Sequence, residues 1–192
     1  MTCVKFLVLF SAMCLIACEQ DVSDAPSDSE QAETAEDTAS DLDAPRFEAD
    51  SVEAFYYPGN DPAWVLLAKS SETWLYIENY PGFGGASESE TRKIKGVDTN
   101  YGTCGVCVLL KTGCQPHGDH AHCQRTFMVE AGGSVTFEDL GRGAGKSWSG
   151  SLSPMRFLEV SMDGDTFETT PIEDGEIVEI GGWDFDVVLE EG

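Results

Sequence analysis

The chain has 192 residues, 35 of them acidic and 11 basic, which gives a formal net charge of −24 at pH 7. This length suits one domain with a tail and is too short for two domains of ordinary size. A surface this negative repels nucleic acid and anionic lipid headgroups, so we exclude both as partners.

Residues 1–17 have the layout of an export signal. Lys5 precedes an apolar run at residues 6–14, which is too short for a bilayer span of roughly 20 residues. The Leu-Ile-Ala-Cys sequence at residues 15–18 resembles the lipobox of bacterial lipoproteins. That resemblance implies that Cys18 becomes the N-terminus and carries a diacylglyceryl anchor with fatty acyl chains such as palmitate. An ordinary secretory signal with an incidental cysteine is the alternative.

The lipobox implies a lipid-anchored protein of a bacterial cell envelope, with the bilayer as its partner. Glu19 is not the Asp that resembles an inner-membrane retention signal in some Gram-negative lipoproteins, so we expect the outer membrane. Residues 19–44 hold ten acidic residues and no basic one. This composition is too polar to support a core and predicts a disordered, extended acidic tether over residues 18–48.

From residue 49 onward, short apolar runs alternate with breaks that contain Gly and Pro. Residues 64–68 and 73–77 predict a hairpin, and the polar stretch 87–95 predicts an edge strand or a loop. Further strands are expected at residues 54–57, 105–111, 125–130, 134–138, 148–152, 158–162 and 183–189. No sustained helical stripe is present. The sequence therefore predicts a single all-β domain over residues 49–192, an antiparallel β-sandwich or jelly-roll-like double sheet with eight to ten strands.

Four cysteines follow the leader, namely Cys104, Cys107, Cys114 and Cys123. In an exported chain such a cluster predicts two disulfides. We expect Cys104 with Cys107 and Cys114 with Cys123, because pairing of the flanking strands brings the loop ends within the roughly 4.4 to 6.8 Å between Cα atoms that a disulfide tolerates. Two other pairings exist, and a zinc site or a redox-active pair are the alternatives.

All three histidines, His117, His120 and His122, fall in the segment between those two strands. Neutral imidazoles at this spacing can bind Zn or Cu, which is the best metal site that the sequence offers. A polar, solvent-exposed loop tip is the alternative and the one we favour. No other cofactor is expected.

Other acidic motifs predict turns and exposed surface. Residues 163–165 and 173–176 lack the spacing of an EF-hand loop and are typical of turns. Asp184 and Asp186 share the solvent face of a strand, where a carboxylate pair supports hydrolysis only inside a cleft. A carbohydrate site would need exposed aromatic rings, but the neighbouring residues place the following aromatics in the core: Tyr56, Tyr57, Trp64 and Trp74.

Residues 104–160 resemble the C-terminal domain of a loosely defined set of bacterial lipoproteins of unknown function. The likeness rests on the Cys-x-x-Cys-Val-Leu-Leu run at 104–110, on Cys123 before Thr126 and Phe127, and on the Gly-Ser-Val-Thr-Phe-Glu-Asp-Leu-Gly segment at 133–141. It implies a cysteine-stapled β-domain without an assigned activity. We therefore expect a non-enzymatic binding or structural domain at the envelope, without catalytic residues. A metal-binding lipoprotein, and a secreted hydrolase or carbohydrate-binding module, are the alternatives.

Overall fold

The computed structural model describes residues 44–117 and 120–192, except for the side chains of residues 116–121. The predicted leader, Cys18 and most of the predicted tether lie outside the described residues. Within them the chain forms strands and two short 3-10 helices, η2 (Pro81–Phe83) and η3 (Gly96–Thr99). No helix in this part of the chain has the length and apolar character needed to cross a bilayer.

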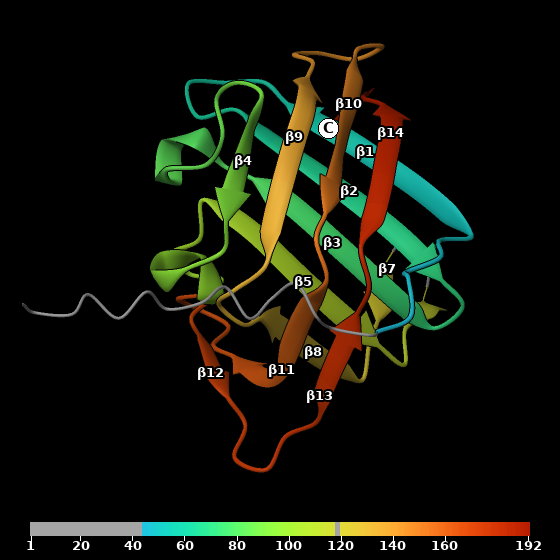
Figure 1. The fold of residues 1–192 in the computed structure, drawn as a ribbon, viewed down its shortest axis with the longest axis vertical. Coiled ribbons are helices and arrows are strands. Elements are labelled where there is room, and N and C mark those ends of the chain that lie inside the picture. The colour runs from blue at the N-terminus through green and yellow to red at the C-terminus, as the bar shows by residue number, and fades with distance from the viewer. Residues whose placement is uncertain (1–43, 118–119) are drawn as a thin grey trace, which may run out of the picture. The chain divides into compact units, whose positions relative to one another are not determined.

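A nine-stranded sheet forms one layer of the domain, in the order β12-β11-β8-β5-β3-β2-β1-β15, with β13 also paired to β11 (Figure 1). Its pairs are antiparallel except for β1 with β15, which is parallel. The strands are β1 (Ser51–Tyr57), β2 (Ala63–Ser70), β3 (Thr73–Asn79), β5 (Val106–Thr112), β8 (Arg125–Val129), β11 (Met155–Met162), β12 (Thr169–Pro171), β13 (Ile177–Ile180) and β15 (Glu190–Glu191).

A four-stranded sheet lies across the larger one and forms the second layer (Figure 1). Its order is β14 (Trp183–Val188), β10 (Ser147–Leu152), β9 (Ser134–Leu140) and β4 (Glu90–Lys93). The core between the sheets is aromatic: the Trp148 ring stacks on Phe137 and meets the edge of Phe185, with centroids 6.3 and 5.7 Å apart. The predicted all-β sandwich is confirmed.

Alternation of apolar residues explains why the long strands could be predicted. On β2, the buried side chains Trp64, Leu66 and Ala68 recur with period two and enter the core. The predicted polar stretch 87–95 contains β4, an edge strand of the smaller sheet. The short strands β12, β13 and β15 were not predicted, because they lie in acidic segments whose residues are typical of turns.

Both predicted disulfides are present, Cys104 with Cys107 and Cys114 with Cys123. The zinc-thiolate alternative for these residues is wrong, because their sulfurs are bonded to one another. The Cys-x-x-Cys pair also leads into strand β5 where a redox pair needs a helix N-terminus. The second disulfide closes the short hairpin of β6 (Gln115–His117) and β7 (His120–His122), which extends from the β5–β8 connection.

The folded domain begins before the boundary at residue 49 that composition suggested. Arg46 forms a parallel bridge to Gly181, and Phe47 is buried with its ring edge-on to Trp183 at a centroid distance of 5.7 Å. A single aromatic residue at the end of an acidic segment is a weak sequence signal, yet it joins the tether to the core.

We expect Phe47→Ala to lower the free energy of unfolding by about 3 kcal/mol, because it empties a buried aromatic position. Urea denaturation of the full chain measures the change. Val188→Ala removes an exposed apolar side chain from β14 and should change stability by less than about 0.5 kcal/mol. Equal effects of the two substitutions would contradict the packing role of Phe47.

Candidate functional site

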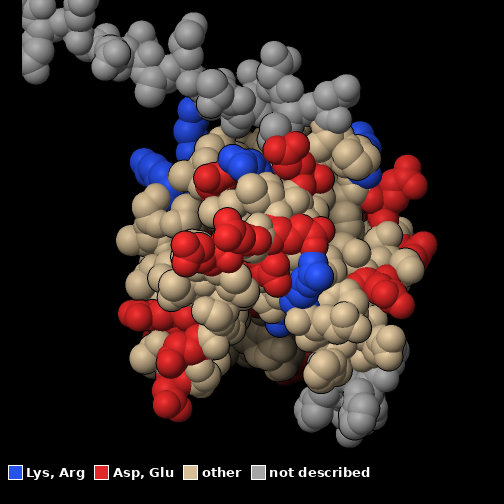
Figure 2. Space-filling model, turned by 90° about the horizontal axis from the view of Figure 1, so that it is seen from below, with Lys and Arg blue, Asp and Glu red and all other residues tan. Residues whose placement is uncertain are grey.

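The face of the larger sheet that points away from the smaller sheet carries an unusual row of side chains. On β3, Leu75, Ile77 and Asn79 point into the core, so the alternating positions Trp74, Tyr76 and Glu78 lie on the opposite face, which we call the outer face. Tyr80 follows directly and extends this row. Figure 2, in which the domain is seen from below, shows a hollow on the side of the outer face.

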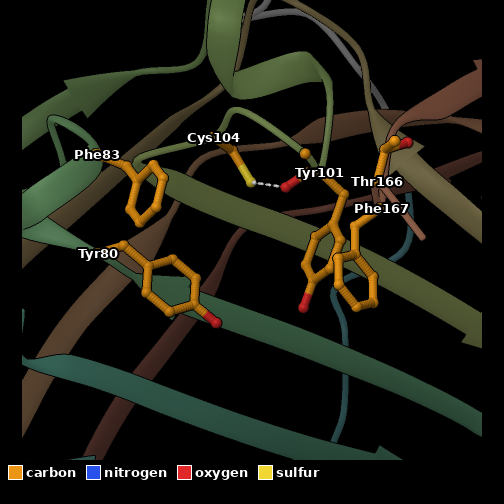
Figure 3. Close-up of a pocket in the computed structure, with 7 residues that line it drawn as sticks. Tyr80, Phe83, Tyr101, Cys104, Thr166 and Phe167 are labelled. Atoms are coloured by element: carbon orange, nitrogen blue, oxygen red, sulfur yellow. Dashed lines mark hydrogen bonds between the residues drawn. The ribbon is translucent and has the colours of Figure 1, made fainter. Parts of the chain in front are cut away.

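A pocket of about 290 Å³ lies at the Tyr80 end of this row. Tyr80 and Phe83 stand on one side of it and Tyr101 and Phe167 on the other, with Cys104 between them (Figure 3). Each pair is edge-to-face, with ring centroids 6.3 Å apart. We call these four residues the aromatic cage. They come from three segments that are distant in sequence, and Gly102 and Thr166 complete the lining.

Below the cage lies a buried carboxyl group. Glu78 is only 7% exposed, and it accepts a hydrogen bond of 2.7 Å from the Tyr80 hydroxyl. Burial raises the pKa of Glu78, although the Tyr80 and Tyr101 hydroxyls act in the opposite direction. Burial, together with the nearby charge of Glu78, also raises the pKa of Tyr80 and Tyr101, so both hydroxyls stay protonated as donors.

Two basic residues share the outer face but engage other rings. Lys111 lies with its Nζ atom 4.8 Å from the centroid of Tyr76, and Lys69 lies 5.0 Å from that of Trp74. The charge of Lys111 lowers the pKa of Glu78 less than burial raises it. Burial and neighbouring carboxylates in turn raise the pKa of Tyr76 to about 12.

Buried polar residues fix the segments that carry the cage. In the described part of the chain these are Glu78, Asn79, Asp98 and Thr169. The amide of Asn79 bonds both the N–H and the carbonyl of Ala86 at 2.8 and 2.9 Å, which closes the turn that holds Phe83. Buried polar groups of this kind are stable only when their partners are in place, so the turn geometry is strongly specified.

The segment with Tyr101 is tied to strand β5 and to the Phe83 turn. The carboxylate of Asp98 accepts hydrogen bonds from the backbone N–H groups of Gly105 and Val106 at 3.2 and 3.3 Å. Gly85 and Gly105 pack backbone to backbone: a Cβ atom on Gly105 would meet the Gly85 nitrogen at 2.5 Å. Only glycine permits this approach, which brings the two loops together.

The third segment is joined to the second through Asn100 and Thr169, which are 69 residues apart. The Asn100 side chain donates to the Thr169 carbonyl and accepts from the Thr169 N–H, both at 3.2 Å. The Tyr101 N–H donates to the Thr169 hydroxyl at 3.2 Å. Each loop of the cage is therefore fixed by side-chain hydrogen bonds to backbone groups.

Phe167 has a costly conformation. Its φ is +60°, a left-handed value that costs a non-glycine residue on the order of 1 kcal/mol or more, yet its side chain remains 54% exposed. The Asp163 carboxylate holds the turn by accepting from the Asp165 N–H and from both the N–H and the hydroxyl of Thr166. These hydrogen bonds lower the pKa of Asp163. The Phe167 ring therefore stands beside the pocket on a costly backbone conformation, without the stability that burial would supply.

The predicted site residues lie elsewhere. The backbone of the β6–β7 hairpin pairs His117 with His120 and Gln115 with His122. The side chains of residues 116–121 fall outside the described part, and His122 is exposed. Within the described residues, no group of three or more His, Cys, Asp and Glu side chains is arranged to hold a metal ion. Asp184 and Asp186 are exposed, as predicted, and Arg46 pairs with Asp184.

The aromatic residues expected in the core are divided between the core and the surface. Trp64 is fully buried and Tyr56 packs against the core, as predicted. The expectation is wrong for Tyr57, which is exposed, and for Trp74, which is half-buried on the outer face. Sequence reasoning missed the cage and Glu78 altogether. The available signal was the alternation of Trp74, Tyr76, Glu78 and Tyr80, which places a carboxylate among aromatic rings on one strand face.

No family model matches this chain, and no match was found among curated proteins or among solved structures. The resemblance to lipoproteins of unknown function therefore remains a prediction from residues 15–18 and 104–160.

We expect Glu78→Gln to stabilise the chain progressively, relative to the parent, as the pH rises. A carboxyl group whose pKa is raised by folding supplies its full stability below its ordinary pKa of 4.5, and that stability is lost as the pH rises through the folded-state pKa. Urea denaturation of both chains between pH 4 and pH 8 measures the difference. A difference independent of pH would show that burial does not perturb Glu78.

Proposed function

We propose that this chain is a lipid-anchored envelope protein whose β-domain binds a small ligand, without catalysing a reaction, in the aromatic cage of Tyr80, Phe83, Tyr101 and Phe167. The observation that carries the proposal is the arrangement of the buried polar residues. Within the described residues, all four of them lie at the segments that form this pocket. Because hydrogen bonds of buried side chains fix every segment of the pocket, a preorganised binding site is favoured over an incidental hollow.

The exposed rings support binding over a purely structural role. Phe83 is 65% exposed and Phe167 is 54% exposed, so neither gains much stability from burial. Both stand at a pocket whose lining is mainly apolar and whose volume approaches the lower range of small-ligand sites, about 300 Å³. Rings held apart in this way gain their burial when a ligand fills the space between them.

The chemistry of the pocket supports a binding role more than hydrolysis. Glycoside hydrolysis by the common mechanism uses two carboxyl groups on opposite sides of the scissile bond. Among the described residues that line the pocket none is a carboxylate, and Glu78 below them accepts a hydrogen bond from the Tyr80 hydroxyl. We therefore assign Glu78 to electrostatics and to positioning of the tyrosine rings.

The proposed address depends on the leader and the tether. A diacylglyceryl group on Cys18 would hold the chain in a bacterial membrane, with the outer membrane favoured by Glu19. An acidic, self-repelling segment of about 26 residues spans roughly 25 to 30 Å as a random coil and more when extended by charge repulsion. Such a tether would keep the binding domain clear of the headgroups.

We expect Phe83→Ala and Phe167→Ala each to weaken ligand binding at least about tenfold, while the melting temperature of the full chain changes by less than about 2 °C, because both rings are exposed. Ligand-observed NMR with a library of small amines, sugars and aromatic compounds identifies the binders. Ile177→Ala removes an exposed apolar side chain from β13 and is the matched control. A library without binders, or binders indifferent to both substitutions, would refute the proposed site.

We expect mass spectrometry of the chain purified from bacterial membranes to find a diacylglyceryl thioether on an N-terminal Cys18. The Cys18→Ser variant should leave the membrane fraction, since it has no thiol to carry the lipid. A variant that still partitions with membranes would contradict the anchor. This test is independent of ligand binding.

Metal binding through the β6–β7 hairpin is a second candidate, supported by the pairing of His117 with His120 in the strand register. We expect isothermal titration with Zn or Cu to give a stoichiometric signal that disappears in a variant with all three histidines replaced by Ala. Equal heats from the parent and the variant would show that the metal binds only to the acidic surface, and this candidate would then be wrong.

A further inference from the structure

We propose that the aromatic cage recognises a quaternary ammonium group, such as a trimethylammonium headgroup, through cation–π contacts with its four rings and attraction to the Glu78 carboxylate below them. This inference rests on the proposed function and adds the chemical class of the ligand. The shared chemistry occurs both in small solutes and in lipid headgroups, so the experiment has an arm for each.

The arrangement of the rings suits a cation that needs contact on several sides. Tyr80 and Phe83 face Tyr101 and Phe167 across the pocket, and the two rings of each pair are nearly perpendicular, at 80° and 77° (Figure 3). A cation within about 6 Å of a ring centroid is attracted by the ring quadrupole, by roughly 0.5 to 2 kcal/mol for each contact. A box of rings also presents more than one aromatic face to a compact, nearly spherical group.

The Glu78 carboxylate gives the site its sign. The Tyr80 hydroxyl donates to it at 2.7 Å, so the carboxylate lies directly behind this ring of the cage. A phenol that donates to a carboxylate has a more electron-rich ring, which strengthens its attraction for a cation. Lys111, whose charge also acts on Glu78, lies over the Tyr76 ring and stands outside the cage lining.

The polar groups around the pocket leave few partners for a hydrogen-bonding ligand. The Tyr80 hydroxyl donates to Glu78, and the Tyr101 hydroxyl interacts with the same carboxyl group. The Thr166 hydroxyl donates to Asp163 at 3.0 Å and accepts from the Glu168 N–H at 3.3 Å. A sugar would place its hydroxyl groups against side chains already engaged, at an energetic cost. A quaternary ammonium group has no N–H donors, so it loses no hydrogen bonds when it enters a pocket without free acceptors.

The charge of the whole chain favours the approach of a cation. The net charge is −24, and Figure 2 shows that acidic side chains outnumber basic ones on the underside of the domain. Phe167 itself belongs to a turn that contains Asp163, Asp165 and Glu168. A field of one sign raises the local concentration of counter-ions and speeds their association.

The test is isothermal titration of the purified full chain with choline chloride, and separately with 3,3-dimethylbutan-1-ol, in which an uncharged carbon replaces the ammonium nitrogen. Both titrations are run at the same ionic strength in sodium chloride, which competes for the diffuse acidic surface. We expect choline to bind at least about tenfold more tightly than its neutral analogue. Equal affinities would show a merely hydrophobic pocket and overturn the inference.

Three variants locate the binding. Phe167→Leu keeps an apolar side chain but removes the ring, and Glu78→Gln removes the charge while conserving its shape; each should weaken choline binding by about threefold to thirtyfold. Phe55→Leu removes an aromatic ring from β1 on the same outer face, two strands from Glu78 and outside the lining of the cage, and should leave the affinity unchanged. Unaltered choline affinity in both Phe167→Leu and Glu78→Gln would place the ammonium site elsewhere and overturn the inference.

Vesicles distinguish the source of the ammonium group. The Cys18→Ser variant, without its proposed anchor, is sedimented with phosphatidylcholine or phosphatidylglycerol vesicles. Selective sedimentation with phosphatidylcholine, lost in Phe167→Leu, identifies a lipid headgroup; binding of choline without sedimentation identifies a free solute. If choline fails but other library compounds bind at the cage, the ligand class is wrong and the proposed function stands. If nothing binds there, both are wrong.

Discussion

The pocket depends on the burial of one carboxyl group. Glu78 lies on a sheet face flanked by Val65 on β2 and Cys107 on β5, and none of the described residues that line the pocket is basic. A carboxyl group in such surroundings is unfavourable unless hydrogen bonds satisfy its oxygens. Tyr80 meets that requirement by donating its hydroxyl to Glu78, and Tyr101 interacts with the same carboxyl group from the opposite side of a space that the protein does not fill.

The rest of the site follows from holding those two tyrosines in place. Tyr80 is fixed because it continues β3, whereas Tyr101 lies in a loop and needs other support. Asp98 ties that loop to the start of β5, and Asn100 ties it to Thr169 at the start of β12. The Cys104–Cys107 disulfide adds a covalent link between this loop and β5. The polar side chains around the pocket therefore have their hydrogen-bond partners in the neighbouring backbone or in one another. The interior of the pocket is left mainly apolar.

Sequence patterns predicted the sandwich because several of its long strands alternate buried and exposed residues. Strand β14 shows how: Trp183 and Phe185 enter the core, and Asp184 and Asp186 face solvent. The disulfides could be predicted because Cys114 and Cys123 flank a connection between adjacent strands, so local geometry determined the pairing. In both cases the relevant partners are close in sequence or follow a period of two.

The pocket could not be predicted because its partners obey neither rule. Asn100 and Thr169 meet across 69 residues, and nothing in either segment specifies the other. Phe167 occupies a left-handed conformation in a segment whose Asp and Gly residues are typical of an ordinary turn. Trp74 has the composition of a core residue, and only the register of β3 places it on the outer face.

The link between Asn100 and Thr169 couples the pocket to an edge of the larger sheet. Thr169 opens β12, a strand of three residues at the end of the sheet, where opening of the ladder needs little free energy. A compound bound in the cage contacts Tyr101 and Phe167, which flank the link between Asn100 and Thr169. A compound that binds only while β12 is paired lowers the population of the form in which β12 is detached. Occupancy of the cage would thus keep β12 paired with β11 and cover the edge of β11. An exposed strand edge is the part of a β-protein most prone to recruit another chain.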